Sequence, residues 1–163
     1  FGTTQFLANA PRWVGEWTGA RPDSKDPFEA GEELIAFWSR IGLSDEEIAA
    51  NRLIIFADGL DVALEGREPN GKDIALIHRH FAGRVGVGFG WGTNLTNDFI
   101  GAEQGDPDLL RSLSLVCKIV SVNGHATVKL SDNPAKANGP PDEVAIYREA
   151  FGSDGMNEVP VRV

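Results

Sequence analysis

Cysteine, methionine and tyrosine each occur once in the 163 residues, and positive charge is scarce. The single cysteine, Cys117, excludes an internal disulfide framework and fits a reducing compartment, so we expect a cytoplasmic protein. Fifteen Lys and Arg against 24 Asp and Glu give a net charge of -9, which argues against a broad nucleic-acid surface. No apolar run reaches the roughly 18–20 residues of a membrane span. We therefore expect neither nucleic acid nor membrane as a partner.

What is present is ordinary for a globular chain, apart from its glycines. Hydrophobic residues make up 42% and charged residues 24%, so disorder is not expected over most of the length. The 19 glycines are many for this size, and they cluster. The first residue is Phe1 rather than Met, from which we expect a piece of a longer protein.

Local signals predict helices and strands in alternation. Asp26 before Pro27 predicts a helix start, because aspartate caps the first turn and proline suits the first helical position. The continuous apolar run 53–57 predicts a strand buried on both faces, as in parallel sheets. Asn123-Gly124 between two β-rich runs predicts a hairpin with a type I′ turn. In order, we expect helix 4–10, strand 17–22, a helix from 27, helix 45–50, strand 53–57, a helical stretch 60–81 broken at 67–71, strand 84–90, hairpin 113–130 and helix 142–151.

This order defines the expected fold class, which is α/β. Buried strands alternating with helices indicate βα units, and three such units do not close an eight-stranded barrel. We therefore expect part of an irregular (β/α) barrel, followed by a C-terminal β-hairpin and helix. Residues 1–152 would form the C-terminal portion of the barrel domain, and residues 153–163 would form a tail.

Each of the three predicted strands is followed by polar or glycine-rich residues. Ligands in α/β folds bind at the C-terminal ends of the strands, so these residues define the candidate site. These residues also have purely structural explanations. Those after the first strand could form a turn before a capped helix, the aspartate after the second strand could be a turn residue before glycine, and the hairpin lysine could be solvated. The candidates are Arg21, Asp23 and Ser24 after the first strand, Asp58 after the second, Gly90, Gly92 and Thr93 after the third, and Lys118 on the hairpin.

Four glycines recur at every second position, at 86, 88, 90 and 92. A period of two places them on one face of a strand. Glycine weakens a strand, so another backbone or a ligand is expected to approach closely there. In favour of a ligand, the following Gly-Thr-Asn can direct successive N–H groups at an anion. The alternative is a tight interior in which only glycine fits.

Five segments occur together in one order: FGTT, RPDSKDP, FADGLD, GFGWGTNLTND, and VCK followed by NG and VKLSD. As a set they resemble the C-terminal half of nicotinate phosphoribosyltransferases, particularly bacterial ones, over about residues 1–152. The resemblance implies an irregular barrel of the type II phosphoribosyltransferase kind. It also implies an enzyme of NAD salvage that joins nicotinate to phosphoribosyl pyrophosphate, with ATP hydrolysis and Mg²⁺, and releases nicotinate mononucleotide and pyrophosphate.

Roles follow from the resemblance residue by residue. Arg21 would lie by the pyridine ring and its carboxylate, and Asp23 would hold ribose hydroxyls. Asp58 would face the ribose and the Mg²⁺-pyrophosphate, which makes Asp58 and Asp23 the candidate metal ligands. The loop 90–93 would cradle the 5′-phosphate, in agreement with the glycine pattern. Ser24 and Lys118 complete the expected substrate-binding set.

The sequence also departs from the family pattern. Lys25 stands where glycine is common, and the stretch around Pro69 is atypical. The family's catalytic histidine lies before the segment that begins at Phe1, so we expect no catalytic residue in this chain. We expect residues 1–163 to be inactive alone and to act in a homodimer together with an N-terminal half. A nicotinamide- or quinolinate-using sibling, or a non-catalytic phosphate-binding fragment, remains as an alternative.

Overall fold

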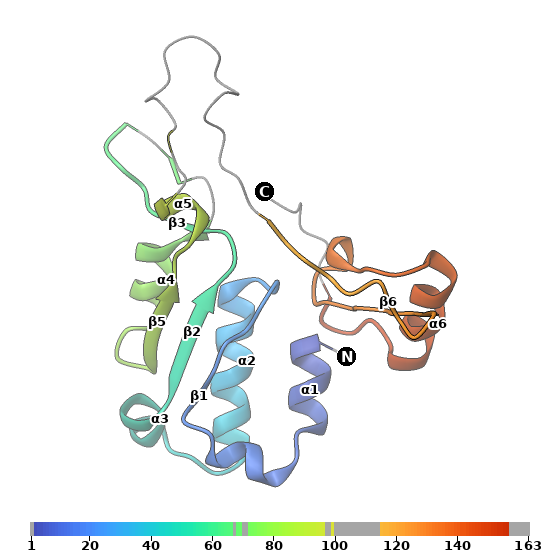
Figure 1. The fold of residues 1–163 in the computed structure, drawn as a ribbon. Helices are drawn as coiled ribbons and strands as arrows, with labels where there is room; N and C mark the ends of the chain where they lie inside the picture. Colours follow the sequence, from blue (N-terminus) through green and yellow to red (C-terminus); the bar gives the residue numbers. More distant parts are fainter. Residues whose placement is uncertain (1, 67, 70–71, 97–98, 100–114, 157–163) are drawn as a thin grey trace.

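The largest sheet has three parallel strands in the order β1-β2-β5 (Figure 1). The computed structural model of the chain describes residues 2–66, 68–69, 72–96, 99 and 115–156. In the central pair, Leu53 lies opposite Gly86 and Ala57 opposite Gly90, so the C-terminal ends of β2 and β5 are level. The strands are β1 (Gly19–Ala20), β2 (Leu53–Ala57) and β5 (Gly86–Gly90).

One face of this sheet is covered by helices and holds the core. Ile54 and Phe56 of β2 are 0% and 1% exposed, and they belong to one cluster with Phe81 and other side chains of the helices. Ile55 points to the opposite face and is 37% exposed. The expectation of a strand buried on both faces is therefore met on one face only. The covering helices are α2 (Pro27–Arg40), α3 (Asp45–Asn51) and α4 (Ile74–Phe81).

Two helix starts confirm the local reading of the sequence. The Asp26 carboxylate accepts hydrogen bonds from the backbone N–H groups of Phe28 and Glu29, as a helix cap does. Ser44 and Glu47 form the reciprocal capping box that starts α3. Both helices therefore begin where short-range side-chain chemistry predicts.

The predicted helical stretch 60–81 is only half right. Its first part contains β3 (Leu60–Asp61), which pairs in parallel with β4 (Lys72–Asp73) in a small separate sheet. The backbone N–H of Lys72 donates to the carbonyl of Gly59 at 2.7 Å, so this turn is stabilised by pairing between strands and not by a helix. The predicted break at 67–71 lies mostly outside the described residues.

The C-terminal part lies on the α1 side of the fold (Figure 1). β6 (Ser121–Val122) and β7 (His125–Ala126) pair antiparallel, and φ is positive at Asn123 and Gly124, as a type I′ turn requires. The paired strands are two residues long, much shorter than the predicted hairpin. The helix α6 (Pro141–Phe151) follows as predicted.

The first helix, α1 (Gly2–Asn9), is held in place by hydrogen bonds to residues 129 or more positions later in the chain. The backbone N–H and the hydroxyl of Thr3 donate to Asp132 at 2.8 and 2.7 Å. Gln5 donates to Asp154, at the start of the expected tail. The described residues thus form a mixed α/β fold with a three-stranded and a two-stranded parallel sheet and no closed barrel among them. None of the described helices is long and apolar enough to cross a membrane.

Candidate functional site

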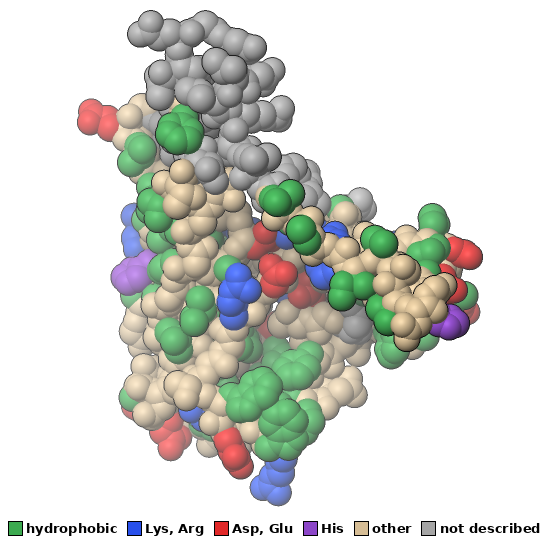
Figure 2. Space-filling view, in the orientation of Figure 1, with side chains coloured by type: hydrophobic (Ala, Val, Ile, Leu, Met, Phe, Trp, Pro, Cys, Tyr) green, Lys and Arg blue, Asp and Glu red, His purple; other side chains and the backbone are tan. Residues whose placement is uncertain are grey.

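The loops that follow β1, β2 and β5 meet at one edge of the sheet. Parallel strands end at the same edge, so the sequence positions predicted to carry ligands come together there. Acidic and basic side chains gather in the hollow between the sheet and the C-terminal segment (Figure 2). The structure therefore brings the β1 and β2 candidates into one neighbourhood.

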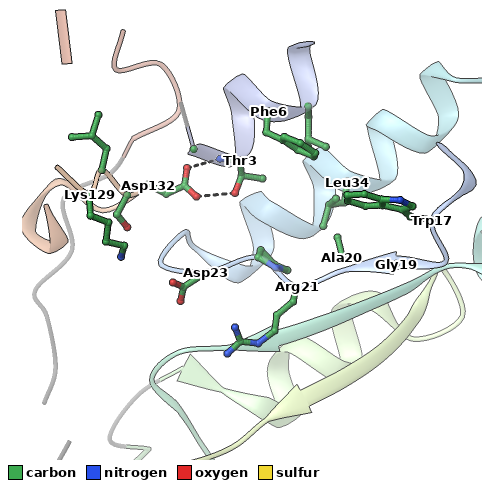
Figure 3. Close-up of a pocket in the computed structure, with 15 residues that line it drawn as sticks. Thr3, Phe6, Trp17, Gly19, Ala20, Arg21, Asp23, Leu34, Lys129 and Asp132 are labelled. Carbon is green, nitrogen blue, oxygen red and sulfur yellow. Dashed lines mark hydrogen bonds between the residues drawn. The ribbon is translucent and has the colours of Figure 1, made fainter. Parts of the chain in front are cut away.

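A cavity of about 490 Å³ lies between α1, the end of β1 and the segment 129–132 (Figure 3). Phe6 and Trp17 provide an aromatic wall. Arg21 and Asp23 also line it, and Figure 3 shows both pointing away from those rings and toward the strand ends. A cavity with an apolar wall and a guanidinium among its lining groups suits a small planar ligand that carries a negative charge.

The two residues after Asp23 are buried rather than presented to the cavity. Ser24 is 5% exposed with φ of +66°, and its hydroxyl has no hydrogen-bond partner among the described residues. The ammonium of Lys25 turns inward, where it lies 2.6 Å from Glu33 and 2.7 Å from the Thr4 hydroxyl. Lys25 therefore joins this loop to α1 and α2 and leaves the cavity open.

Asp58 ends β2 with φ of +72° and is paired with a lysine that sequence reasoning missed. Its carboxylate lies 2.5 Å from the ammonium of Lys136, 78 positions later in the chain. The predicted lysine, Lys118, is exposed and donates at 3.4 Å to the backbone carbonyl of Lys136. The lysine beside the β2 end is therefore Lys136, and no local pattern distinguishes it from a surface lysine.

A second missed lysine, Lys72, lies between the β1 and β2 loops. Its ammonium donates to the carbonyl of Lys25 at 3.3 Å. Burial lowers the pKa of Lys72 below its ordinary value, and Asp58 opposes part of that shift. Lys136, whose own ammonium is bonded to Asp58, adds to the lowering.

The structural reason for glycine differs between the positions of the alternating series 86–92. A Cβ at Gly86 would lie 2.8 Å from the carbonyl oxygen of Arg52, so close backbone approach explains that glycine. A Cβ at Gly90 would make ordinary contact with Ala57 at 3.4 Å. At Gly92 it would meet no described atom within 4 Å, and φ there is not in the left-handed region. Packing among the described residues therefore does not require glycine at 92.

The loop after β5 is short and tied down. Gly92 is followed by α5 (Thr93–Thr96), and the carbonyl of Gly92 accepts from Leu95 and Thr96. The side chain of Asn94 donates to the carbonyl of Leu60 at 3.0 Å, which ties this loop to the β3 turn. The predicted residues Gly90, Gly92 and Thr93 thus lie on a loop anchored beside the end of β2.

The described residues do not form a metal site by themselves. No group of three or more His, Cys, Asp or Glu side chains within them is arranged to hold a metal ion. The carboxylate of Asp58 is already engaged by Lys136. A cation would compete with that ammonium for the same oxygens, so Asp58 and Asp23 alone do not fit a resident Mg²⁺.

Fold and site together define an α/β protein whose candidate ligand site lies at the C-terminal edge of its parallel strands. The chain belongs to the nicotinate phosphoribosyltransferase (NAPRTase) family, whose model matches residues 1–154. The crystal structure of nicotinate phosphoribosyltransferase from Vibrio cholerae is 31% identical with a TM-score of 0.70, covering 90% of this chain and 32% of that one. The enzyme from Porphyromonas gingivalis is 27% identical with a TM-score of 0.65, covering 90% and 34%. The family expected from the sequence is confirmed, and the chain spans about a third of those structures.

Proposed function

We propose that the protein carrying this chain joins nicotinate to phosphoribosyl pyrophosphate. The pyridine nitrogen would attack C1 of the ribose as pyrophosphate leaves, giving nicotinate mononucleotide for NAD salvage. The observation that carries the proposal is the meeting of Arg21, Asp58 and the loop at Gly92 on one sheet edge, in a chain of this family. Such a reaction develops positive charge on the ribose, so positioned groups of fixed charge would accelerate it.

This chain would supply the phosphate and ribose side of the site. Arg21 would lie by the pyridine ring and hold the nicotinate carboxylate, because a guanidinium pairs well with a planar carboxylate. Asp23 and Asp58 would accept hydrogen bonds from ribose hydroxyls. The open backbone at Gly92 and Thr93 would receive the 5′-phosphate. Lys118 would act at the rim of the site, since the residue is exposed and its ammonium donates to the carbonyl of Lys136.

ATP and Mg²⁺ belong to this proposal as components of the whole reaction. In this proposal Mg²⁺ would arrive bound to the pyrophosphate group of the substrate. Closure of the barrel, a homodimer and a cytoplasmic location likewise stay predictions. No step above depends on any of them.

The experiment is a competition between pyridine substrates in the full-length protein. Nicotinate, nicotinamide and quinolinate are each supplied with phosphoribosyl pyrophosphate and Mg²⁺, with and without ATP, and the mononucleotide products are separated by chromatography. We expect nicotinate mononucleotide to form fastest. Preferential use of nicotinamide or quinolinate would assign the chain to a sibling activity. Phosphate binding without any product would favour the non-catalytic alternative.

A further inference from the structure

Pairing between two strands fixes the backbone position of Lys72. This residue begins β4, and its N–H donates to the carbonyl of Gly59 at 2.7 Å, directly after Asp58. Lys72 lies outside the five segments that carry the resemblance to the family.

The side chain of Lys72 reaches back over the site. Its ammonium donates to the carbonyl of Lys25 at 3.3 Å, so one residue links the loop after β1 to the loop after β2. An ammonium has three N–H donors. A carbonyl satisfies one of them and neutralises none of the charge.

The charges around Lys72 leave room for an anion. The carboxylate that acts most strongly on Lys72, that of Asp58, is bonded to Lys136. Asp23 in the loop after β1 acts on Lys72 only weakly. Asp26 also acts on Lys72 more weakly than Asp58 does, and its carboxylate accepts hydrogen bonds from two helix N–H groups. The Lys72 ammonium is half-buried, and the carboxylate that acts on it most strongly is bonded to a second lysine. Pairing with an incoming phosphate therefore stabilises this ammonium more than it would stabilise a solvated lysine.

We propose that Lys72 is a further substrate-binding residue, whose ammonium together with that of Lys136 grips a phosphate or pyrophosphate group above Asp58. The proposal rests on the proposed function and adds a residue to that site. The group bound is the phosphorylated substrate and not the pyridine, because Lys72 reaches the loops at Lys25 and Gly59 and does not line the aromatic cavity.

The test compares three variants of the full-length protein. Lys72→Met removes the charge and keeps the length of the side chain, Lys72→Arg keeps the charge, and Arg79→Met removes an exposed charge from α4 as a matched control. Calorimetry measures the Kd of phosphoribosyl pyrophosphate, of inorganic pyrophosphate and of nicotinate. A lost charge-assisted hydrogen bond predicts a Kd raised about tenfold or more for both phosphates in Lys72→Met. We expect the Kd of nicotinate to stay within about twofold, with Lys72→Arg restoring most of the loss and Arg79→Met changing nothing.

Unchanged phosphate binding in Lys72→Met, or equal loss for all three ligands, would overturn the proposal. If Lys72→Met does not fold, acetylation of the wild-type protein followed by mass spectrometry gives the answer. Phosphoribosyl pyrophosphate should protect Lys72 and nicotinate should not, and labelling that ignores both ligands would equally overturn the assignment. Failure of the proposed function is a separate result: tight, Lys72-dependent pyrophosphate binding without product would retain this site and reject the transferase.

Discussion

Replacing Gly31 by alanine should destabilise the protein, although alanine is the better helix former. Gly31 lies in α2 against the ring of Phe81 in α4. A Cβ at this position would overlap Phe81 Cζ and come within 2.6 and 2.9 Å of the two Cε atoms. The ring is fully buried and stacked on Phe56, with centroids 5.2 Å apart, so it has little room to move.

The expected magnitude follows from two opposing effects. Overpacking a rigid core costs about 1–3 kcal/mol, and the higher helix propensity of alanine returns about 1 kcal/mol. Because a Cβ would come within 3 Å of three atoms of a ring that has little room to move, the cost should fall in the upper part of the overpacking range, about 2–3 kcal/mol, which leaves a net loss of about 1–2 kcal/mol. For a chain of this size that corresponds to a fall in Tm of roughly 2–8 °C.

Thermal unfolding followed by circular dichroism measures this difference. Ala36→Gly on the exposed side of α2 is the matched control, because it isolates the propensity effect without the clash. Phe81→Leu should relieve part of the overlap, so the double variant with Gly31→Ala should lose less than the sum of the single losses. A Tm of Gly31→Ala at or above that of the wild type would refute the packing of α2 on α4 as described.

Three further predictions concern the site and the surface. Gly92→Val should weaken binding of phosphoribosyl pyrophosphate at least about tenfold, because the side chain would fill the space for the phosphate. Nicotinate affinity and Tm should stay near wild type, because the new side chain meets no described atom. Equal loss of affinity for both ligands in calorimetry would mean misfolding. Asp26→Ala should lose about 1 kcal/mol in chemical denaturation with the cap of α2, whereas Asp26→Asn should keep most of it, and identical losses would contradict the cap. The Arg84 hydrogen bond lowers the pKa of Glu32 to about 2 from 4.5, so its stabilisation is present above pH 4.5 and lost as pH falls toward 2. Because the pair is exposed, we expect Glu32→Gln to lose only about 0.5–1 kcal/mol near neutral pH, converging on wild type near pH 2, and a gap independent of pH would argue against this linkage.

Elements fixed by short-range chemistry are the ones that the sequence predicts well. The cap at Asp26, the capping box at Ser44 and the apolar run 53–57 each depend on side chains within a few positions of one another. The positive φ angles at Asn123 and Gly124 are equally local. Such signals predict helices, strands and a turn without any knowledge of tertiary contacts.

The stretch 60–66 shows where this reasoning fails. Its apolar residues resemble a helical pattern, but pairing of Leu60 with Lys72 across the intervening loop determines the conformation. Lys136 was missed for the same reason, since it meets Asp58 only through tertiary contact. The strand-end rule predicted which loops converge, but it gave no means of predicting which lysines would join them from outside the strands.

The fastening of Thr3 by Asp132 has a consequence for the order of assembly. The sheet and its covering helices join residues 19–90, whereas the cavity needs two ends of the chain that are 129 positions apart. Closing so long a loop costs more entropy than closing the shorter ones within the sheet, and non-local contacts form slowly. We therefore expect the cavity wall at α1 to form after the sheet, and during synthesis only once residue 132 has emerged from the ribosome. Protection of the Thr3 amide in pulsed hydrogen exchange, appearing after that of β2, would record this step.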